Sequence, residues 1–152
     1  MTMIKKILIA VDNSACALRA AKKGFQLAQQ LNADVGLVFV INRNREAISA
    51  DLDISQEESQ TVLLKRAEET IQQVIRMDDG EKEVFRFTPE GYPKEEIINT
   101  ALHWNADIVV MGTHGHTGLQ HLLTGSVAEH VIRHFTRPVM VVPMKREGTK
   151  RN

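Results

Sequence analysis

Short apolar runs alternate with segments of helical periodicity along this chain, and no other feature of the sequence constrains the fold as strongly. Nearly continuous apolar runs rich in β-branched residues are typical of strands buried on both faces. Where such strands alternate with helices, the expected architecture is α/β, with a parallel sheet and helices on both of its faces. The predicted strands cover residues 4–11, 34–41, 83–88, 107–111 and 139–142.

Four helices are predicted between these strands from apolar residues at spacings of three and four. Asn13 and Ser14 are candidate N-caps for the first helix, which is expected to end near Asn32. Ser55, with a glutamate three residues later, resembles a capping box for the second helix, and Gly80 suits its C-terminal cap. The residues expected to face inward from these two helices are Leu18, Ala21, Phe25, Ala28, Leu63, Ala67, Ile71 and Val74.

The third helix is predicted to begin at Pro93, because proline is favoured at the first helical position. Ser126 is the predicted N-cap of the fourth helix. Residues 42–55 show no periodicity and are expected to form a long loop. The residues expected to face inward from the third and fourth helices are Ile97, Ile98, Ala101, Leu102, Ala128, Val131, Ile132 and Phe135.

Length and charge narrow the possible classes of protein. The chain has 152 residues, which suits one domain, expected over residues 1–144, followed by a flexible basic tail over residues 145–152. Lysine plus arginine and aspartate plus glutamate number 19 each, so the formal net charge is zero. We therefore expect no general attraction to nucleic acid or to an anionic membrane surface.

The cysteine content and the apolar runs bear on the cellular compartment. Cys16 is the only cysteine, so an internal disulfide or a cysteine metal site is excluded, which fits a reducing compartment. No apolar run approaches the length of a membrane span, and the run at residues 7–11 is too short for a signal peptide. The expected location is the cytoplasm.

A strand, a glycine-rich loop and a helix start follow one another between residues 107 and 129. The apolar run is followed by Gly112, Gly115 and Gly118, and Gly125-Ser126 precedes the last helix. Glycine lets backbone N–H groups approach a ligand, and a helix start adds free N–H donors at the positive end of a dipole. This order predicts an anion cradle, most often for phosphate, although the glycines alone could equally shape a surface loop.

The glycine spacing differs from that of a Walker P-loop and from G-x-G-x-x-G. Gly112, Gly115, Gly125 and Ser126 instead resemble the G-x2-G-x9-G-S signature of ATP-binding universal stress proteins. Residues 7–14 are similar to that family's first strand and its acidic tip, and residues 138–143 to its last strand. The resemblance covers nearly the whole chain and is weak only over residues 43–60.

The resemblance implies a single-domain Rossmann-like fold of the adenine nucleotide alpha hydrolase-like type. Its five-stranded parallel sheet would have the order 3-2-1-4-5, with helices on both faces. That order places a topological switch between the first and fourth strands, and ligands bind at the carboxyl ends of strands that flank such a switch. Asp12 and the loop beginning at Gly112 follow those two ends.

Asp12 is the acidic residue at the tip of the first strand. Its carboxylate could accept hydrogen bonds from a ribose or approach a phosphate-bound metal ion; alternatively it helps to cap the first helix. The resemblance implies contact with the nucleoside. It further implies that the backbone of Val40 reads the adenine edge and that His114 packs near the phosphates or the sugar. The other residues expected to bind the nucleotide are Ala10, Val11, Met111, Gly112, Gly115, Gly125, Ser126, Val127 and Ala128.

The sequence predicts neither a histidine metal site nor a catalytic site. His114, His116 and His121 lie close together in the sequence but on a glycine-rich loop without a carboxylate, so no metal site built by side chains is predicted. No nucleophile elbow and no general base beside the loop are found, so no catalytic residue is predicted. The histidines expected to be ordinary surface or boundary residues of helices are His103, His130 and His134.

These features favour an ATP-binding universal stress protein that acts as a nucleotide-dependent sensor or adaptor in a stress response. The resemblance implies ATP, or ADP or AMP, with Mg²⁺ or Mn²⁺ bound mainly through the phosphates. Two alternatives stay open. One is a slow ATPase or a phosphate- or nucleotidyl-transferring enzyme on the same pocket, and missing catalytic groups weigh against it. The other is a nucleotide-free dimerising scaffold, and the intact signature weighs against that.

The fifth strand is expected to mediate self-association. In the implied order it is an edge strand, and an open apolar edge invites pairing with another chain. Two-fold pairing of the same edge in a homodimer, as the resemblance implies, would satisfy its backbone groups. The residues of this predicted interface are Val139, Met140, Val141 and Val142.

Overall fold

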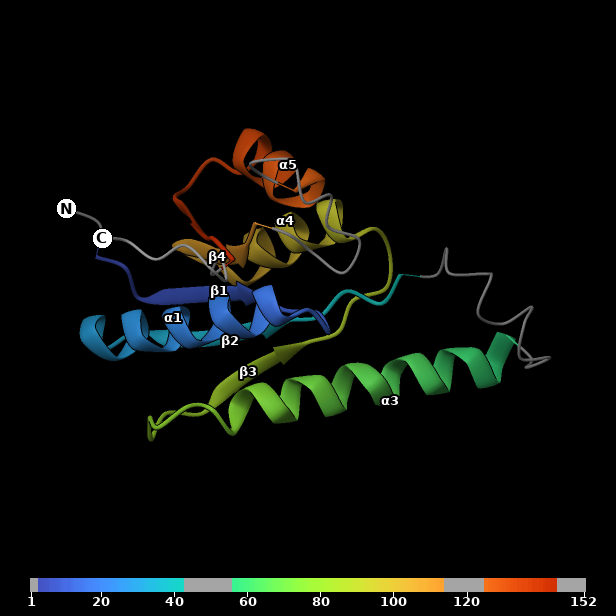
Figure 1. Ribbon diagram of the computed structural model, residues 1–152. Coiled ribbons are helices and arrows are strands. Elements are labelled where there is room, and N and C mark those ends of the chain that lie inside the picture. Colours follow the sequence, from blue (N-terminus) through green and yellow to red (C-terminus); the bar gives the residue numbers. More distant parts are fainter. Residues whose placement is uncertain (1–2, 43–55, 114–124, 145–152) are drawn as a thin grey trace, which may run out of the picture.

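The computed structural model describes residues 3–42, 56–113 and 125–144. Its five strands form one parallel sheet in the order β3-β2-β1-β4-β5, which confirms the predicted fold class and strand order (Figure 1). The elements in chain order are β1 (Lys6–Ala10), α1 (Ala15–Leu31), β2 (Asp34–Val38), α3 (Gln56–Ile75), β3 (Val84–Phe87), α4 (Pro93–Trp104), β4 (Ile108–Gly112), α5 (Ser126–His134) and β5 (Val139–Val142).

The sheet separates two apolar layers, because successive strand residues point to opposite faces. In β1, Ile7 and Ile9 belong to the cluster that contains Phe25 of α1 and Ile71 of α3. Leu8, between them, belongs to the cluster formed with α4 and α5. Figure 1 shows the same division, with α1 and α3 on one side of the sheet and α4 and α5 on the other. The central strands are therefore buried on both faces, as their continuous apolar runs predict.

Several helices begin or end at the residues that the capping and proline patterns of the sequence predicted. Ser14 caps α1 and accepts a hydrogen bond from the N–H of Ala17 at 3.1 Å. Asn32 closes the same helix in the left-handed region, with φ of 53°, where asparagine is tolerated better than most residues. Pro93 is the first residue of α4, where its missing N–H costs nothing.

Two predicted caps are wrong. The last buried residue of α3 is Val74 and the helix ends at Ile75, so it stops before Gly80. The N–H of Gly80 donates instead to a carboxylate oxygen of Asp78 at 3.0 Å. Gly125, not Ser126, is the N-cap of α5; it has the extended conformation of that position, with φ of −63° and ψ of 157°. Ser126 is the first helical residue.

Three residues expected to face inward lie at the margin of the buried stripe. Leu18, Leu102 and Ile132 are 36%, 53% and 48% exposed, whereas the residue before each of them is buried. Neighbouring helical residues point about 100° apart, and apolar spacing alone does not define how wide the covered stripe is. The predicted loop over residues 42–55 and the capping box at Ser55 lie outside the described residues, apart from residue 42.

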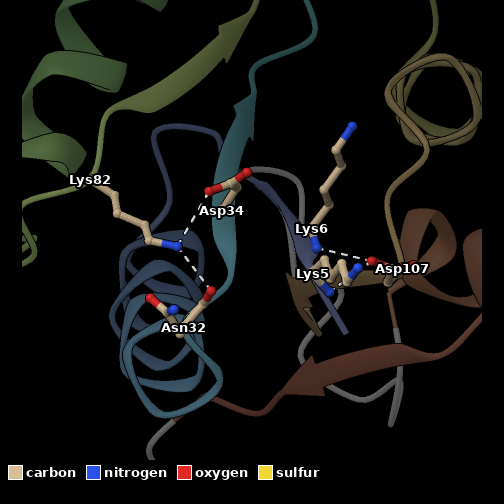
Figure 2. A network of polar contacts seen from close by, with 6 residues as sticks. All are labelled: Lys5, Lys6, Asn32, Asp34, Lys82 and Asp107. Carbon is tan, nitrogen blue, oxygen red and sulfur yellow. Dashed lines mark hydrogen bonds and ion pairs between the residues drawn. The ribbon is translucent and has the colours of Figure 1, made fainter. Parts of the chain in front are cut away.

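The amino-terminal edge of the sheet is held by polar contacts (Figure 2). One carboxylate oxygen of Asp107, before β4, accepts hydrogen bonds from the N–H groups of Lys5 and Lys6 at 2.8 and 3.0 Å. The ammonium of Lys82 lies 3.5 Å from a carboxylate oxygen of Asp34, at the start of β2. These contacts join the beginnings of the strands, at the edge opposite their carboxyl ends.

Candidate functional site

The neighbouring strands β1 and β4 separate at their carboxyl ends. The register of β1 on β4 ends at Ile9 opposite Val110. Beyond that point the N–H of Val11 donates to the carbonyl of Val38 at 2.9 Å, on the β2 side. The N–H of Thr113 donates to Val142 at 3.2 Å, on the β5 side. The two backbones therefore turn away from each other, as expected at a topological switch point.

Asp12 lies at this parting point and is half-buried. Its Oδ1 accepts a hydrogen bond from the N–H of Ser14 at 2.7 Å, which rigidifies the turn into α1. The donor is the N-cap residue itself, so this oxygen orders the turn before α1, while the hydroxyl of Ser14 caps the helix. Within the described residues, no side chain or backbone group donates to Oδ2.

Asn13 ties the same turn to the far helix. Its side-chain oxygen accepts a hydrogen bond from the hydroxyl of Thr70, in α3, at 2.6 Å. Thr70 is one of the few buried polar residues, so this bond also satisfies a hydroxyl that water does not reach freely. The conformation of the loop that carries Asp12 thus depends on the position of α3, a relationship that no local sequence pattern indicates.

Gly112 is required by packing within the protein. A Cβ atom at this position would lie 2.5 Å from the sulfur of Cys16 and 3.1 Å from its carbonyl oxygen. Such distances leave no room for a side chain where α1 crosses the end of β4. The first glycine of the signature therefore allows α1 to approach the sheet closely, in addition to any role toward a ligand.

Thr113 closes the base of the glycine loop and was not among the predicted site residues. Its carbonyl accepts a hydrogen bond from the N–H of Gly125, which brings the start of α5 beside the end of β4. Its hydroxyl lies 3.8 Å from the buried sulfur of Cys16. The sequence signal that could have indicated Thr113 is a polar residue directly after a buried strand.

The N-terminus of α5 presents backbone donors at this edge. The first intrahelical bond runs from the N–H of Glu129 to the carbonyl of Gly125 at 2.9 Å. The N–H groups of Ser126, Val127 and Ala128 precede it and have no acceptor within the helix. Ser126 is exposed and Val127 half-buried, so an anion can reach this end.

Val40 lies two residues beyond the end of β2, which stops earlier than predicted. The N–H of Phe39 donates to Phe87 and that of Ile41 to Pro89, at 2.9 and 2.8 Å, both on the β3 side. Because backbone groups alternate in direction along an extended chain, those of Val40 point to the β1 side. Its half-buried side chain packs in the same cluster as Ala10. The N–H and the carbonyl of Val40 therefore face the end of β1.

The structure brings most of the predicted site residues to the carboxyl edge of the sheet. Val11 and Met111 are buried beneath it, and Ala10 and Gly112 are half-exposed at the ends of β1 and β4. The described residues contain no group of three or more histidine, cysteine, aspartate or glutamate side chains that could hold a metal ion. The predicted residues that lie outside the described ranges are His114 and Gly115, together with Gly118, His116, His121 and the basic tail.

No helix in the described part of the chain is both long and apolar enough to cross a membrane.

Comparison with known proteins places the chain in one family. Residues 3–143 match the model of the universal stress protein family. Universal stress protein MJ0531 of Methanocaldococcus jannaschii is 34% identical over 141 residues, which cover 92% of this chain and 82% of the relative. MJ0577 of the same organism is 34% identical over 158 aligned positions, covering 94% and 97% of the two chains.

Solved structures agree with the sequence comparison. The structure of MJ0577 has a TM-score of 0.82 at 33% identity and covers 96% of this chain and 100% of that chain. A universal stress protein of Archaeoglobus fulgidus in complex with dAMP has a TM-score of 0.63 at 23% identity, covering 92% and 98%. A universal stress protein in complex with cAMP has a TM-score of 0.65 at 20% identity, covering 93% and 98%. These last two structures share the fold. The family match over nearly the whole chain and the relatives at 34% identity establish that this chain belongs to the universal stress protein family.

Proposed function

We propose that this chain binds an adenine nucleotide at the carboxyl edge between β1 and β4 and acts as a nucleotide-dependent sensor or adaptor in a stress response. The observation that carries the proposal is the parting of the two strands after Ile9 and Val110, with a carboxylate on one side and a helix N-terminus on the other. A negatively charged phosphate chain suits the helix end, and a hydroxyl donor suits the carboxylate.

Each part of the nucleotide has a candidate partner. The N–H groups of Ser126, Val127 and Ala128 would hold phosphate oxygens. The Oδ2 atom of Asp12 would accept a hydrogen bond from a ribose hydroxyl. The adenine would lie over the end of β1, where the backbone of Val40 could pair with its edge.

ATP, or ADP or AMP, is the proposed ligand, with Mg²⁺ or Mn²⁺ held mainly through the phosphates. Since the described residues offer no cluster of three metal-binding side chains, phosphate oxygens would supply most of the ligands, with Asp12 as a carboxylate at the same edge. Relatives solved with dAMP and with cAMP support an adenine nucleotide as the class of ligand.

The decisive experiment is a thermal-unfolding series with and without ATP and Mg²⁺. Ligand at about 100 times its dissociation constant stabilises the native state by roughly 2.7 kcal/mol. For a domain of this size that is a rise in melting temperature of about 5–10 °C. Asp12→Ala, Gly115→Val and Gly125→Val are expected to abolish most of the rise.

Gly125→Val is the sharpest of these variants. Valine readily adopts the extended backbone that Gly125 has, so the variant should fold while its side chain obstructs the helix end. Thr136→Val, just beyond the other end of α5, is the matched control and should keep the full rise. If the parent shows no rise with ATP, ADP or AMP at millimolar concentration, and mass spectrometry finds no nucleotide after purification, the scaffold alternative replaces this proposal.

We also propose that the chain forms a homodimer through β5. This strand lies at the edge of the sheet, and Val139, Met140 and Val141 are only half-buried. Ile132, on the helix that packs beside β5, adds apolar surface that the chain itself leaves 48% exposed. A second copy of the chain, paired along the same edge, would cover both β5 and the side chain of Ile132.

A further inference from the structure

Two histidines form a stacked pair on the surface of α5. His130 and His134 are four residues apart, so their side chains rise from the same face of the helix. Their ring centroids are 4.1 Å apart and the ring planes are inclined by 25°. The sequence predicted both as ordinary helix residues, but a spacing of four residues on one helix face also allows two histidines to bind a single metal ion.

The protonation state of His134 follows from its hydrogen bond. Its Nδ1 lies 2.9 Å from the carbonyl oxygen of His130. A carbonyl only accepts, so Nδ1 carries the proton and Nε2 keeps its lone pair whenever the ring is neutral. Histidines that bind metals are commonly oriented in this way, with the second ring nitrogen donating to a backbone carbonyl.

The surroundings of the pair are close to electrically balanced. The pKa of His130 is lowered by partial burial, by His134 and by Lys94, while Glu95 acts in the opposite direction. Beside the pair, the carboxylate of Glu129 is held at 2.8 Å by Arg133. Because the carboxylate of Glu129 is paired with Arg133, the two imidazole rings are the ligands that the protein would supply.

We propose that His130 and His134 form a surface site for a divalent transition-metal ion of the Cu²⁺, Ni²⁺ or Zn²⁺ type. With metal–nitrogen bonds of about 2.0–2.1 Å, two ligand nitrogens lie roughly 3 Å apart. Because the two side chains rise from one face of the helix, rotation about their side-chain bonds would turn one nitrogen of each ring toward a shared ion. Water completes the coordination, so the site accepts exchangeable ions rather than a permanently enclosed one.

This site is separate from the proposed nucleotide site. His130 lies two residues after Ala128 and His134 is the last residue of α5, whereas the proposed phosphate donors are backbone N–H groups of the first turn. The metal would be bound by side chains, and the phosphate by the backbone at the helix end. Metal binding at the histidines can therefore be tested without nucleotide, and its failure would leave the nucleotide proposal untouched.

The test is a calorimetric titration of untagged full-length protein with Ni²⁺, without nucleotide. The parent is expected to bind one Ni²⁺ at this pair, and His130→Gln and His134→Gln should each weaken that binding at least tenfold. His103→Gln is the matched control, because this exposed histidine near the end of α4 has no helical histidine partner, and its affinity should equal that of the parent. The loop histidines are present in every one of these variants, so any contribution from them cancels.

A spectroscopic measurement identifies the ligands directly. With one equivalent of Cu²⁺, electron paramagnetic resonance should show two coordinated imidazole nitrogens in the parent and one in His134→Gln. Melting temperatures without metal check that each variant is folded. Unchanged Ni²⁺ affinity in both pair variants, or an equal loss in His103→Gln, would overturn the proposal, as would a Cu²⁺ spectrum that His134→Gln leaves unaltered.

Discussion

The hydroxyl of Thr70 donates a 2.6 Å hydrogen bond to the side-chain oxygen of Asn13, 57 residues away. This contact joins α3 to the turn that precedes α1. Asp12, the residue before Asn13, lies in the same turn and faces the proposed nucleotide site. Replacing Thr70 by valine keeps the shape of the side chain but removes the donor. We expect Thr70→Val to lower the free energy of unfolding by about 1 kcal/mol, measured in urea, because one partly buried hydrogen bond is lost.

The same substitution should weaken nucleotide binding if the turn positions Asp12. Thr70→Ser retains the hydroxyl and is expected to restore the affinity, although it loses a buried methyl group. An affinity that follows stability in both variants, and not the presence of the hydroxyl, would contradict a positioning role.

Gly112 has no space for a side chain beside Cys16. A Cβ atom would lie 2.5 Å from the sulfur and 3.1 Å from the carbonyl oxygen, so α1 would have to shift away from β4. We expect Gly112→Ala to destabilise the protein by about 1–3 kcal/mol in chemical denaturation, as overpacked sites do. Gly80→Ala is the control, because its new Cβ meets only the side chain of Asp78, and it should change stability by less than about 0.5 kcal/mol.

We expect Asp107 to stabilise the amino-terminal edge of the sheet more than the ion pair between Lys82 and Asp34 does. Its carboxylate accepts two backbone hydrogen bonds, from Lys5 and Lys6. We expect Asp107→Ala to lower the free energy of unfolding by about 1–2 kcal/mol, because bonds to a charged acceptor are strong and two donors lose their partner. Lys82→Ala breaks a half-exposed ion pair with Asp34 and an exposed hydrogen bond to the carbonyl of Asn32, and should cost less than about 1 kcal/mol. Equal effects of the two variants in urea denaturation would contradict this ranking.

The proposed dimer makes a prediction about β5. Val141 is half-buried on this edge strand, and a lysine there would place a charge in the paired interface. We expect Val141→Lys to be monomeric in sedimentation at micromolar protein, where the parent is a dimer. Leu102→Lys changes an exposed leucine on α4 and should remain dimeric. A monomeric parent protein would contradict the proposed homodimer.

Any hydrolysis of ATP should be slow. No lysine or arginine lies between Gly112 and Ser126 to stabilise charge on the transferred phosphate. We expect turnover below about 1 s⁻¹, the lower end typical of kinases, in a steady-state phosphate-release assay. Faster hydrolysis that copurifies with the protein and disappears in Asp12→Ala would support the enzyme alternative instead.

The strands, the helices and the fold class could be predicted from local patterns of residues. Continuous apolar runs identified the strands, and the fifth was predicted with the bounds that the structure has, Val139–Val142. Ser14 and Pro93 located two helix starts, because capping and proline effects act within one turn of the chain. The strand order came from the family resemblance, since neighbouring strands in a parallel sheet need not be neighbours in sequence.

Contacts between residues far apart in the chain could not be predicted and became visible in the folded protein. The bond from Thr70 to Asn13 and the contact of Gly112 with Cys16 each join elements far apart in the chain, so no local pattern contains them. The exposure of Leu102 was also decided there, because a helix buries only the stripe that its neighbours cover. The stacked histidines were visible in the sequence as a spacing of four residues, but their ring geometry and the bond that fixes the proton depend on packing around α5.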